Sequence, residues 1–532
     1  MVRAALVLAF ALAVPSLARA TPAPDSVAVL ANADVPGSVA LAARYAEARS
    51  IPAAQVCALP LPTGADMSFE EFDTLLRQPF DACLGAVRDR IEAVVIVRGV
   101  PLRTGTPSGA RISVAAALGV WDSTLPDGSP VLGSPPGVTA DCGGTPCLRA
   151  RLPNAYGGEP FRAGWSFETS DMFHRPVLVT MLHGRSDADA GSLLDAALAA
   201  EEAGGATGPF LLMRGADPAR GSLDGTYPGV ERALEERGMT VLVEDFANDA
   251  TGRTFAGFIT GTASLGTTIE GNGYAPGALV DNLTSFGAVP ENFAPTGEVQ
   301  VSIARWVAAG VAGAHGTVDE PLNNCFPMRD FLVDYVDGAT LAEAYLGRMP
   351  YAYWMNLVLG DPMLAPYAAR PTVAIEGLTE GGSFGGTELR VTATPPAGRA
   401  VASLVLYVDG VEVARSAGEA LTHCLAPELP GEVSVLAVAR TAFEPALPRP
   451  YPGAGWAEVA AMARGGANGC EAPDAGPADA GASDAGTAAP ADAGVLPSSA
   501  GCGCRAAGHG PLPIAPLLLA LVLAVRRVTR SA

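Results

Sequence analysis

Residues 93–97 read AVVIV, and residues 98–103, directly behind them, read RGVPLR. An unbroken apolar run, as opposed to an alternating one, is typical of a strand that a parallel sheet buries on both faces. The glycine, the proline and the two arginines then mark a polar loop. This stretch therefore predicts a central strand of an α/β fold, with Arg98 and Arg103 beyond its carboxyl end.

Strand patterns of this kind alternate with helix patterns over residues 21–370. A helix pattern at 187–203 follows a strand pattern at 177–182, and another at 296–309 precedes a strand at 311–314. Repeated strand–helix units predict an α/β domain with a mainly parallel sheet and helices on both faces, in a flavodoxin-like build. The remaining strands are expected at 27–30, 56–61, 210–213, 240–243 and 255–259, and a further helix at 229–237.

Past residue 370 the pattern changes to strict alternation of apolar and polar residues. Residues 387–394 and 432–439 alternate in this way, and Asp409-Gly410 joins two more such runs as a two-residue hairpin turn. No helix pattern intervenes. Residues 371–465 therefore predict a small β-sandwich of the immunoglobulin-like kind.

Composition excludes several functions. The chain has 532 residues, 34 Lys+Arg and 55 Asp+Glu, for a formal net charge of −21, and its sequence contains no lysine. A phosphate-loop lysine and a Schiff-base lysine are therefore excluded. So acidic a chain is also a poor partner for nucleic acid. Since it has neither an H-E-x-x-H motif nor paired C-x-x-C motifs, we expect no bound metal and no cofactor.

The first twenty residues predict a secretory signal peptide. Arg3 gives a charged start, residues 4–14 an apolar core, and Ala18-Arg19-Ala20 a cleavage site. The apolar core is too short to span a bilayer, so a retained anchor is the weaker alternative.

Residues 466–500 predict a disordered linker, because Asp-Ala-Gly recurs amid alanine, proline and serine. Residues 501–532 then hold Cys502 and Cys504, an apolar run at 511–525 and arginines behind it. This tail resembles the MYXO-CTERM sorting tails of myxobacterial surface proteins. The resemblance implies a sorting protease acting near the two cysteines and transfer to the outer surface. A plain membrane anchor with its arginines in the cytoplasm is the alternative.

Nine cysteines fit an exported protein with disulfides. The pairs we expect are Cys57 with Cys83, Cys142 with Cys147, and Cys424 with Cys470, which leaves Cys325 over. The middle pair lies in residues 120–165, whose glycine and proline content predicts an excursion from the α/β domain.

A resemblance to a family covers residues 27–367. The stretches that carry it are VLAN (29–32), SIP (50–52), RGVPLR (98–103), PGA (276–278), LTSFG (283–287), GTVDEP (316–321), FP (326–327) and GDP (360–362). Together they resemble an uncharacterised, exosortase-associated family of secreted bacterial proteins. The resemblance implies export and envelope sorting without an established activity.

A more distant likeness concerns the build of the domain. LGDPML at residues 359–364 is similar to the close of gingipain-type, caspase-like cysteine peptidases, which implies a caspase-like sheet. Those enzymes use a histidine at one strand end and a cysteine at the next. The corresponding segments here, 261–268 and 277–287, contain neither residue.

Ligands of open parallel sheets bind beyond the carboxyl ends of the strands. The polar side chains expected there can bind an anionic or polar ligand through charge-assisted hydrogen bonds. These candidate ligand-binding residues are Arg98, Arg103, Asp281, Asp319, Glu320, Asn323 and Asp361.

His315 and Cys325 are the candidate catalytic couple, because an imidazole can activate a thiolate. Both lie on one expected loop, whereas nucleophile and base usually come from separate elements. Two functions therefore remain open. The first is a surface-anchored, non-catalytic envelope protein that binds a polar ligand or protein, and the second is a divergent caspase- or gingipain-like peptidase.

Overall fold

The computed structural model describes residues 21–105, 111–121, 123, 132, 152–153, 167–169, 172–174, 177–295, 298–467 and 469–470. All of them belong to one compact unit. The expected signal peptide, the Cys142–Cys147 pair, the sorting tail, nearly all of the linker and most of the excursion lie outside these residues.

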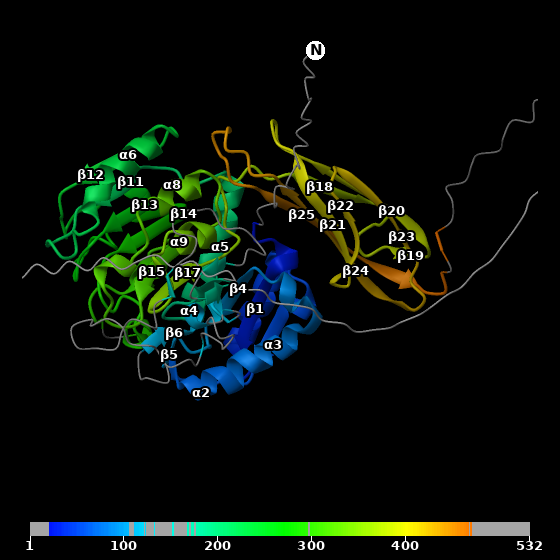
Figure 1. Cartoon of the computed structure of the whole chain (residues 1–532), viewed down its shortest axis with the longest axis horizontal. Helices are drawn as coiled ribbons and strands as arrows, with labels where there is room; N and C mark the ends of the chain where they lie inside the picture. Colours follow the sequence, from blue (N-terminus) through cyan, green and yellow to red (C-terminus); the bar gives the residue numbers. More distant parts are fainter. Residues whose placement is uncertain are drawn as a thin grey trace, which may run out of the picture. The chain divides into compact units, whose positions relative to one another are not determined.

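A ten-stranded sheet forms the centre of the first part (Figure 1). Strands β2, β1, β4 and β10 pair in parallel, and so do β12, β11, β13, β14 and β15. Strand β17 lies between the two groups and runs antiparallel to β15. In spatial order the strands are β12 (Val241–Glu244), β11 (Phe210–Met213), β13 (Thr254–Thr260), β14 (Gly273–Asn282), β15 (Gly313–Thr317), β17 (Asn356–Gly360), β10 (Leu178–Leu182), β4 (Ala93–Val97), β1 (Val27–Asn32) and β2 (Val56–Leu59).

The prediction of an α/β domain with a largely parallel sheet is confirmed. Strand β4 is buried at all five residues, as its unbroken apolar run requires. Helices pack on the sheet through two apolar clusters. They are α1 (Pro36–Ala48), α2 (Phe69–Glu71), α3 (Gln78–Leu84), α4 (Val114–Gly119), α5 (Asp187–Ala203), α6 (Tyr227–Glu235), α7 (Ile303–Ala308), α8 (Phe331–Val336) and α9 (Leu341–Gly347).

Helix α7 is shorter than its sequence pattern predicts. It begins at Ile303, not at residue 296. Gln300 has a left-handed backbone with φ 59°, and Asn292 bonds both backbone groups of Val299. Ser302 then caps the helix through the amide of Ala304. These side chains fix an irregular loop where apolar periodicity alone predicts a helix.

A small sheet lies beyond the carboxyl end of β4. It consists of β3 (Asp66–Met67), β5 (Arg103–Gly105) and β6 (Arg111–Ser113), and it carries the loop that follows β4. Further short strands are β7 (Leu152–Pro153), β8 (Phe167–Thr169), β9 (Met172–His174) and β16 (Tyr351–Tyr353).

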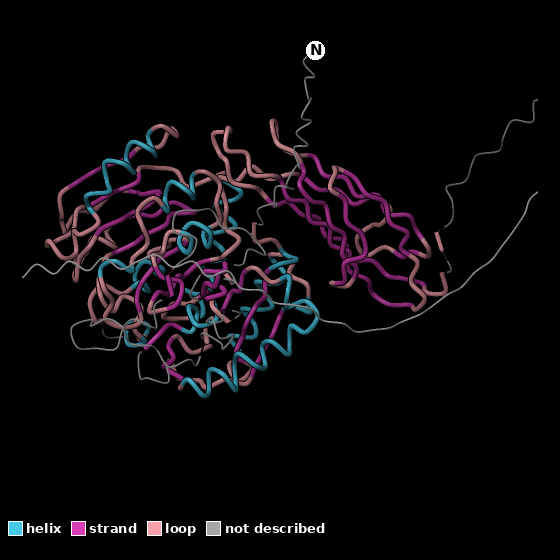
Figure 2. The backbone as a smooth tube through the Cα atoms, viewed as in Figure 1, coloured by secondary structure: helices cyan, strands magenta, loops and turns pink. Residues whose placement is uncertain are grey.

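From residue 372 onward the described chain contains strands and no helix (Figure 2). Two sheets enclose one apolar cluster, which makes a β-sandwich. Asp409 and Gly410, with φ 49° and 76°, form the predicted hairpin turn. One sheet holds β18 (Thr372–Glu376), β20 (Thr387–Thr394) and β23 (Ala420–Leu425), and the other β19 (Ser383–Phe384), β25 (Ala454–Arg464), β24 (Pro430–Thr441), β21 (Val401–Val408) and β22 (Val411–Ser416).

Two predicted disulfides are confirmed, Cys57–Cys83 and Cys424–Cys470. The first ties edge strand β2 to helix α3, and the second ties β23 to residues that follow β25. Among the described residues, no helix is long and apolar enough to cross a bilayer.

Candidate functional site at the carboxyl edge

Two contacts show that both strand groups end at one edge of the sheet. Arg103, beyond β4, donates to the carbonyl of Val318, beyond β15, over 3.1 Å. The ring of His183, at the end of β10, packs edge-on against Phe293, beyond β14, with centroids 4.6 Å apart. We call this edge, with the loops that follow β1, β4, β10, β14 and β15, the carboxyl edge.

Asn32 at the end of β1 holds three loops of the carboxyl edge together. It is fully buried, and its Nδ2 donates to the carbonyls of Gly99 (2.8 Å), Leu61 (3.1 Å) and Pro62 (3.2 Å). Its Oδ1 accepts from the amides of Leu61 and Asp34. Because every donor and acceptor of this amide is used, Asn32 serves the fold rather than a ligand.

Arg98 forms an ion pair with Asp187, the first residue of helix α5. Its guanidinium also donates to the carbonyl of Arg185 over 3.4 Å. Asp187 in turn lies directly against Gly37, at the start of α1, where a Cβ would meet its carboxylate at 2.3 Å. The amino ends of the two longest helices of the α/β domain thus meet at Arg98, beyond the central strand β4.

His183 is a residue of this edge that the sequence-based selection missed. It is 8% exposed, and among the described residues its Nδ1 has no hydrogen-bond partner. Burial, with a smaller effect of the neighbouring Arg98 charge, lowers the pKa of His183 to about 3. The imidazole is therefore neutral at physiological pH. The signal was present in the sequence, because His183-Gly184 directly follows the strand pattern at 177–182, which only Thr180 interrupts, as Arg98-Gly99 follows β4.

Arg103 and Arg111 stand on the small sheet, and both are paired with carboxylates. Arg103 is 6% exposed and donates from Nη2 to Asp66 over 3.0 Å. Arg111 lies 3.8 Å from Asp319. The pairing of Arg103 with a carboxylate fixes the loop after β4, whereas the more exposed pair at Arg111 can exchange partners with a ligand.

Ser285 and Glu320 meet on the loops that follow β14 and β15. The hydroxyl of Ser285 donates to Oε1 of Glu320 over 2.6 Å, and Ser285 is half-buried whereas Glu320 is exposed. Phe286 has φ 63°, a conformation that costs a bulky residue of order 1–3 kcal/mol. Asn292 holds this strained residue by donating to its carbonyl over 2.7 Å. The loop therefore presents Ser285 in a braced position.

Asn323 lies on the outer part of the same edge. Its Nδ2 donates to the carbonyl of Ala219 over 2.7 Å, and the side chain is exposed. In the described parts of the chain, no group of three or more His, Cys, Asp or Glu residues is placed to hold a metal ion.

His315 and Asp281 are not exposed at the edge, contrary to their sequence-based placement. They lie inside the sheet on β15 and β14, and His315 Nδ1 is 2.7 Å from Asp281 Oδ1. Nε2 of His315 is 3.0 Å from Oδ1 of Asn356, and Arg329 forms an ion pair with the other oxygen of Asp281. Burial alone would raise the pKa of Asp281, but Arg329 and His315 bring it below its ordinary value.

Cys325 lies in the apolar core and is 0% exposed. His315 is 1% exposed, and other side chains already bond both of its ring nitrogens. The imidazole is therefore occupied as a structural link between β14 and β17, and this arrangement does not favour its use as a base for a thiol.

Asp361 lies apart from the carboxyl edge, which corrects its sequence-based placement. It accepts hydrogen bonds from Tyr45 Oη (2.8 Å) and Arg49 Nε (2.7 Å). Arg49 closes helix α1, which runs back from the carboxyl edge for about 20 Å. Arg49 also donates to Glu201 at the end of α5. Strand β17 runs antiparallel to β15 over five residue pairs and meets β10 at one bridge only. The bonds of Asp361 to residues at the carboxyl-terminal end of α1 place it at the opposite edge of the sheet.

No family model matches the chain, and no curated protein matches it. Among solved structures, the chain is similar to the fibronectin(III)-like modules of Clostridium thermocellum CbhA. The identity is 16%, the match covers 17% of this chain and 94% of that chain, and the TM-score is 0.14. At this TM-score the similarity carries no argument about fold or function.

Proposed function

We propose that the protein is a non-catalytic binding protein of the bacterial cell envelope, which binds a polar ligand or protein at the carboxyl edge. In this proposal the α/β domain has a caspase-like or flavodoxin-like build, and the sandwich is of the immunoglobulin-like kind. The site consists of Arg98, Arg111, Asp319, Ser285 and Glu320.

The observation that carries this proposal is that both ring nitrogens of His315 already have partners inside the sheet. Asp281 and Asn356 bond its two ring nitrogens inside the sheet. A general base must be within hydrogen-bond reach of the proton that it abstracts. A peptidase centre built on His315 and Cys325 would require the imidazole to leave two buried partners, so binding is the better-supported function.

The exposed groups of the edge suit a ligand with both donors and acceptors. Arg98 and Arg111 are 31% and 57% exposed, and within the described part of the chain each is paired with a single carboxylate. Exposed ion pairs contribute little to stability, about 0–1 kcal/mol, so a ligand can replace one partner at low cost. Ser285 and Glu320 add a hydroxyl and a carboxylate as further hydrogen-bonding groups.

Export and surface anchoring remain part of the proposal. The signal-like residues 1–20, the tail with Cys502 and Cys504, and the resemblance to exosortase-associated proteins support them. Mass spectrometry of the mature protein tests this directly. We expect an amino terminus near Thr21 and a carboxyl terminus near Cys502 or Cys504, and the intact chain in the cytosol would contradict both.

Ligand binding is tested by thermal unfolding of the protein with inorganic phosphate, citrate and triglutamate as probes. We expect at least one probe to raise the unfolding temperature, and Arg98→Ala or Arg111→Ala to remove the rise. Arg390→Ala is the matched control, because Arg390 is exposed on the sandwich strand β20. A rise that persists in both edge variants would place the ligand elsewhere.

A further inference from the structure

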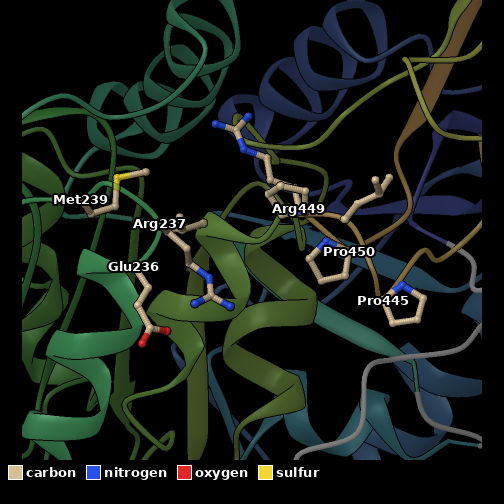
Figure 3. A pocket seen from close by; sticks show the side chains of 9 residues that line it. Glu236, Arg237, Met239, Pro445, Arg449 and Pro450 are labelled. Carbon is tan, nitrogen blue, oxygen red and sulfur yellow. The ribbon is translucent and has the colours of Figure 1, made fainter.

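A cavity of about 310 Å³ opens between the turn that follows helix α6, helix α8 and the loop that joins β24 to β25. In Figure 3 the side chains of Arg237 and Met239 come from the α/β domain, and those of Pro445 and Pro450 come from the loop. The volume is at the small end of the range for ligand pockets. Six of its nine lining residues are apolar, namely Met239, Val336, Pro445, Leu447, Pro448 and Pro450, and the other three are charged.

The proline-rich wall is held in place before any ligand arrives. Arg399 is 8% exposed and donates from Nη1 to the carbonyl of Tyr451 over 2.9 Å. Its Nη2 donates to the carbonyl of Arg449. The amide of Glu444 donates to the carbonyl of Pro450 over 3.1 Å, which closes the loop. A rigid, preformed wall loses little conformational entropy when it binds, so it favours affinity.

The two guanidinium groups of the cavity differ in availability. Arg237 donates from Nη2 to Asp337 over 2.7 Å and from Nη1 to the carbonyl of Ala233, so its charge is neutralised. Arg449 donates from Nη1 to the carbonyl of Tyr367 over 3.0 Å. Across the described residues no carboxylate forms an ion pair with Arg449. Its Nε and Nη2 therefore keep their capacity to bond an anion.

Glu236 contributes a carboxylate to the same lining. Its negative charge repels any anion, and the repulsion grows with the charge of the anion. A phosphate or a dicarboxylate is therefore disfavoured more strongly than a ligand with one negative charge and an apolar body. The charge of Arg449 and the apolar wall together fit such a ligand.

We propose that this cavity binds a monocarboxylate with an apolar body, with its carboxylate on Arg449 and its apolar body against Met239 and the proline-rich wall. This site is separate from the carboxyl edge, and it does not depend on the function proposed there. Two sources share the chemistry, a free aliphatic acid and the carboxyl terminus of a peptide that ends in an apolar residue.

Isothermal titration calorimetry of the full chain tests the proposal with three probes, hexanoate, hexanol and acetyl-alanyl-leucine. We expect hexanoate or the acetylated dipeptide to bind and hexanol to bind at least tenfold more weakly. Arg449→Ala is expected to weaken the bound carboxylate about 10- to 100-fold, the usual range for a charge-assisted hydrogen bond. Arg390→Ala, with the same change in charge on β20, is expected to leave binding unchanged.

The probe that binds identifies the source. Hexanoate alone indicates a free acid, and the dipeptide, together with loss of binding in its amidated form, indicates a peptide terminus. Met239→Trp fills the cavity and is expected to abolish binding while the circular dichroism spectrum stays native. The proposal is overturned if neither carboxylate binds, if hexanol binds as tightly as hexanoate, or if Arg449→Ala leaves the affinity unchanged.

Discussion

Arg329→Met removes the guanidinium that neutralises Asp281 and keeps most of the side chain's length. The side chains of this ion pair are 1% and 0% exposed. Removing one partner of a buried pair costs about 3–5 kcal/mol, because the other charge stays buried without compensation. His315 still bonds Asp281. We therefore expect a loss near the lower value, about 3 kcal/mol, in the free energy of unfolding at pH 8.

The contribution of Asp281 to stability should depend on pH in opposite directions in the native protein and in Arg329→Met. In the native protein the pKa of Asp281 is lowered, since Arg329 and His315 outweigh the effect of burial. Its ionised form therefore stabilises the fold above its unfolded pKa of about 4, and this contribution is lost as the pH falls through the lowered pKa. In Arg329→Met the guanidinium no longer opposes the effect of burial, so the pKa of Asp281 rises. The ionised carboxylate then destabilises the fold, and stability falls as the pH rises.

Urea denaturation at pH 5 and pH 8, followed by tryptophan fluorescence, measures both effects. The matched control is Arg415→Met, which breaks the exposed Arg415–Glu412 pair and should cost less than about 1 kcal/mol. The reasoning is refuted if the Arg329 variant is as stable as the control at pH 8, or if it gains stability between pH 5 and pH 8.

Other changes give further tests. Burial raises the pKa of Glu92 to about 8, so it destabilises the fold increasingly as the pH rises from about 4.5 to 8. The stabilisation that Glu92→Gln gives, measured by urea titration, should therefore be up to about 5 kcal/mol larger at pH 9 than at pH 4. Asn32→Leu leaves buried carbonyls without donors and should cost about 3 kcal/mol in the same assay, and an unchanged midpoint would contradict its role. Joint replacement of Cys57 and Cys83 by alanine should lower the free energy of unfolding by about 3 kcal/mol. In this variant, a reductant should cause no further loss of stability through the Cys57–Cys83 disulfide.

Local signals in the sequence predicted much of the fold. Helix α5 matches its predicted bounds, because Ser186 and Asp189 form a capping box and Gly204 ends it in a left-handed conformation. Strand β4 was equally clear from its apolar run. Strand β14 was missed, because Pro276 and Gly277 interrupt its pattern.

The candidate site was harder to predict, because it depends on strand order and direction. Asp361 follows an apolar strand as Arg98 does, yet β17 runs antiparallel to β15, and Asp361 pairs with Arg49. Asp281 and His315 are polar residues within strands, and only the pairing of β14 with β15 brings them together. His183 could have been selected by the rule that selected Arg98.

Alkylation of Cys325 is the most direct test of whether Cys325 and His315 form a reactive thiol–imidazole centre in the α/β domain. The native protein is treated with iodoacetamide at pH 8, and the peptide that contains Cys325 is quantified by mass spectrometry before and after unfolding in urea. Since Cys325 is 0% exposed and both nitrogens of His315 are bonded elsewhere, we predict modification only after unfolding. Rapid modification of the native protein, lost in a His315→Ala variant that remains folded, would contradict the account.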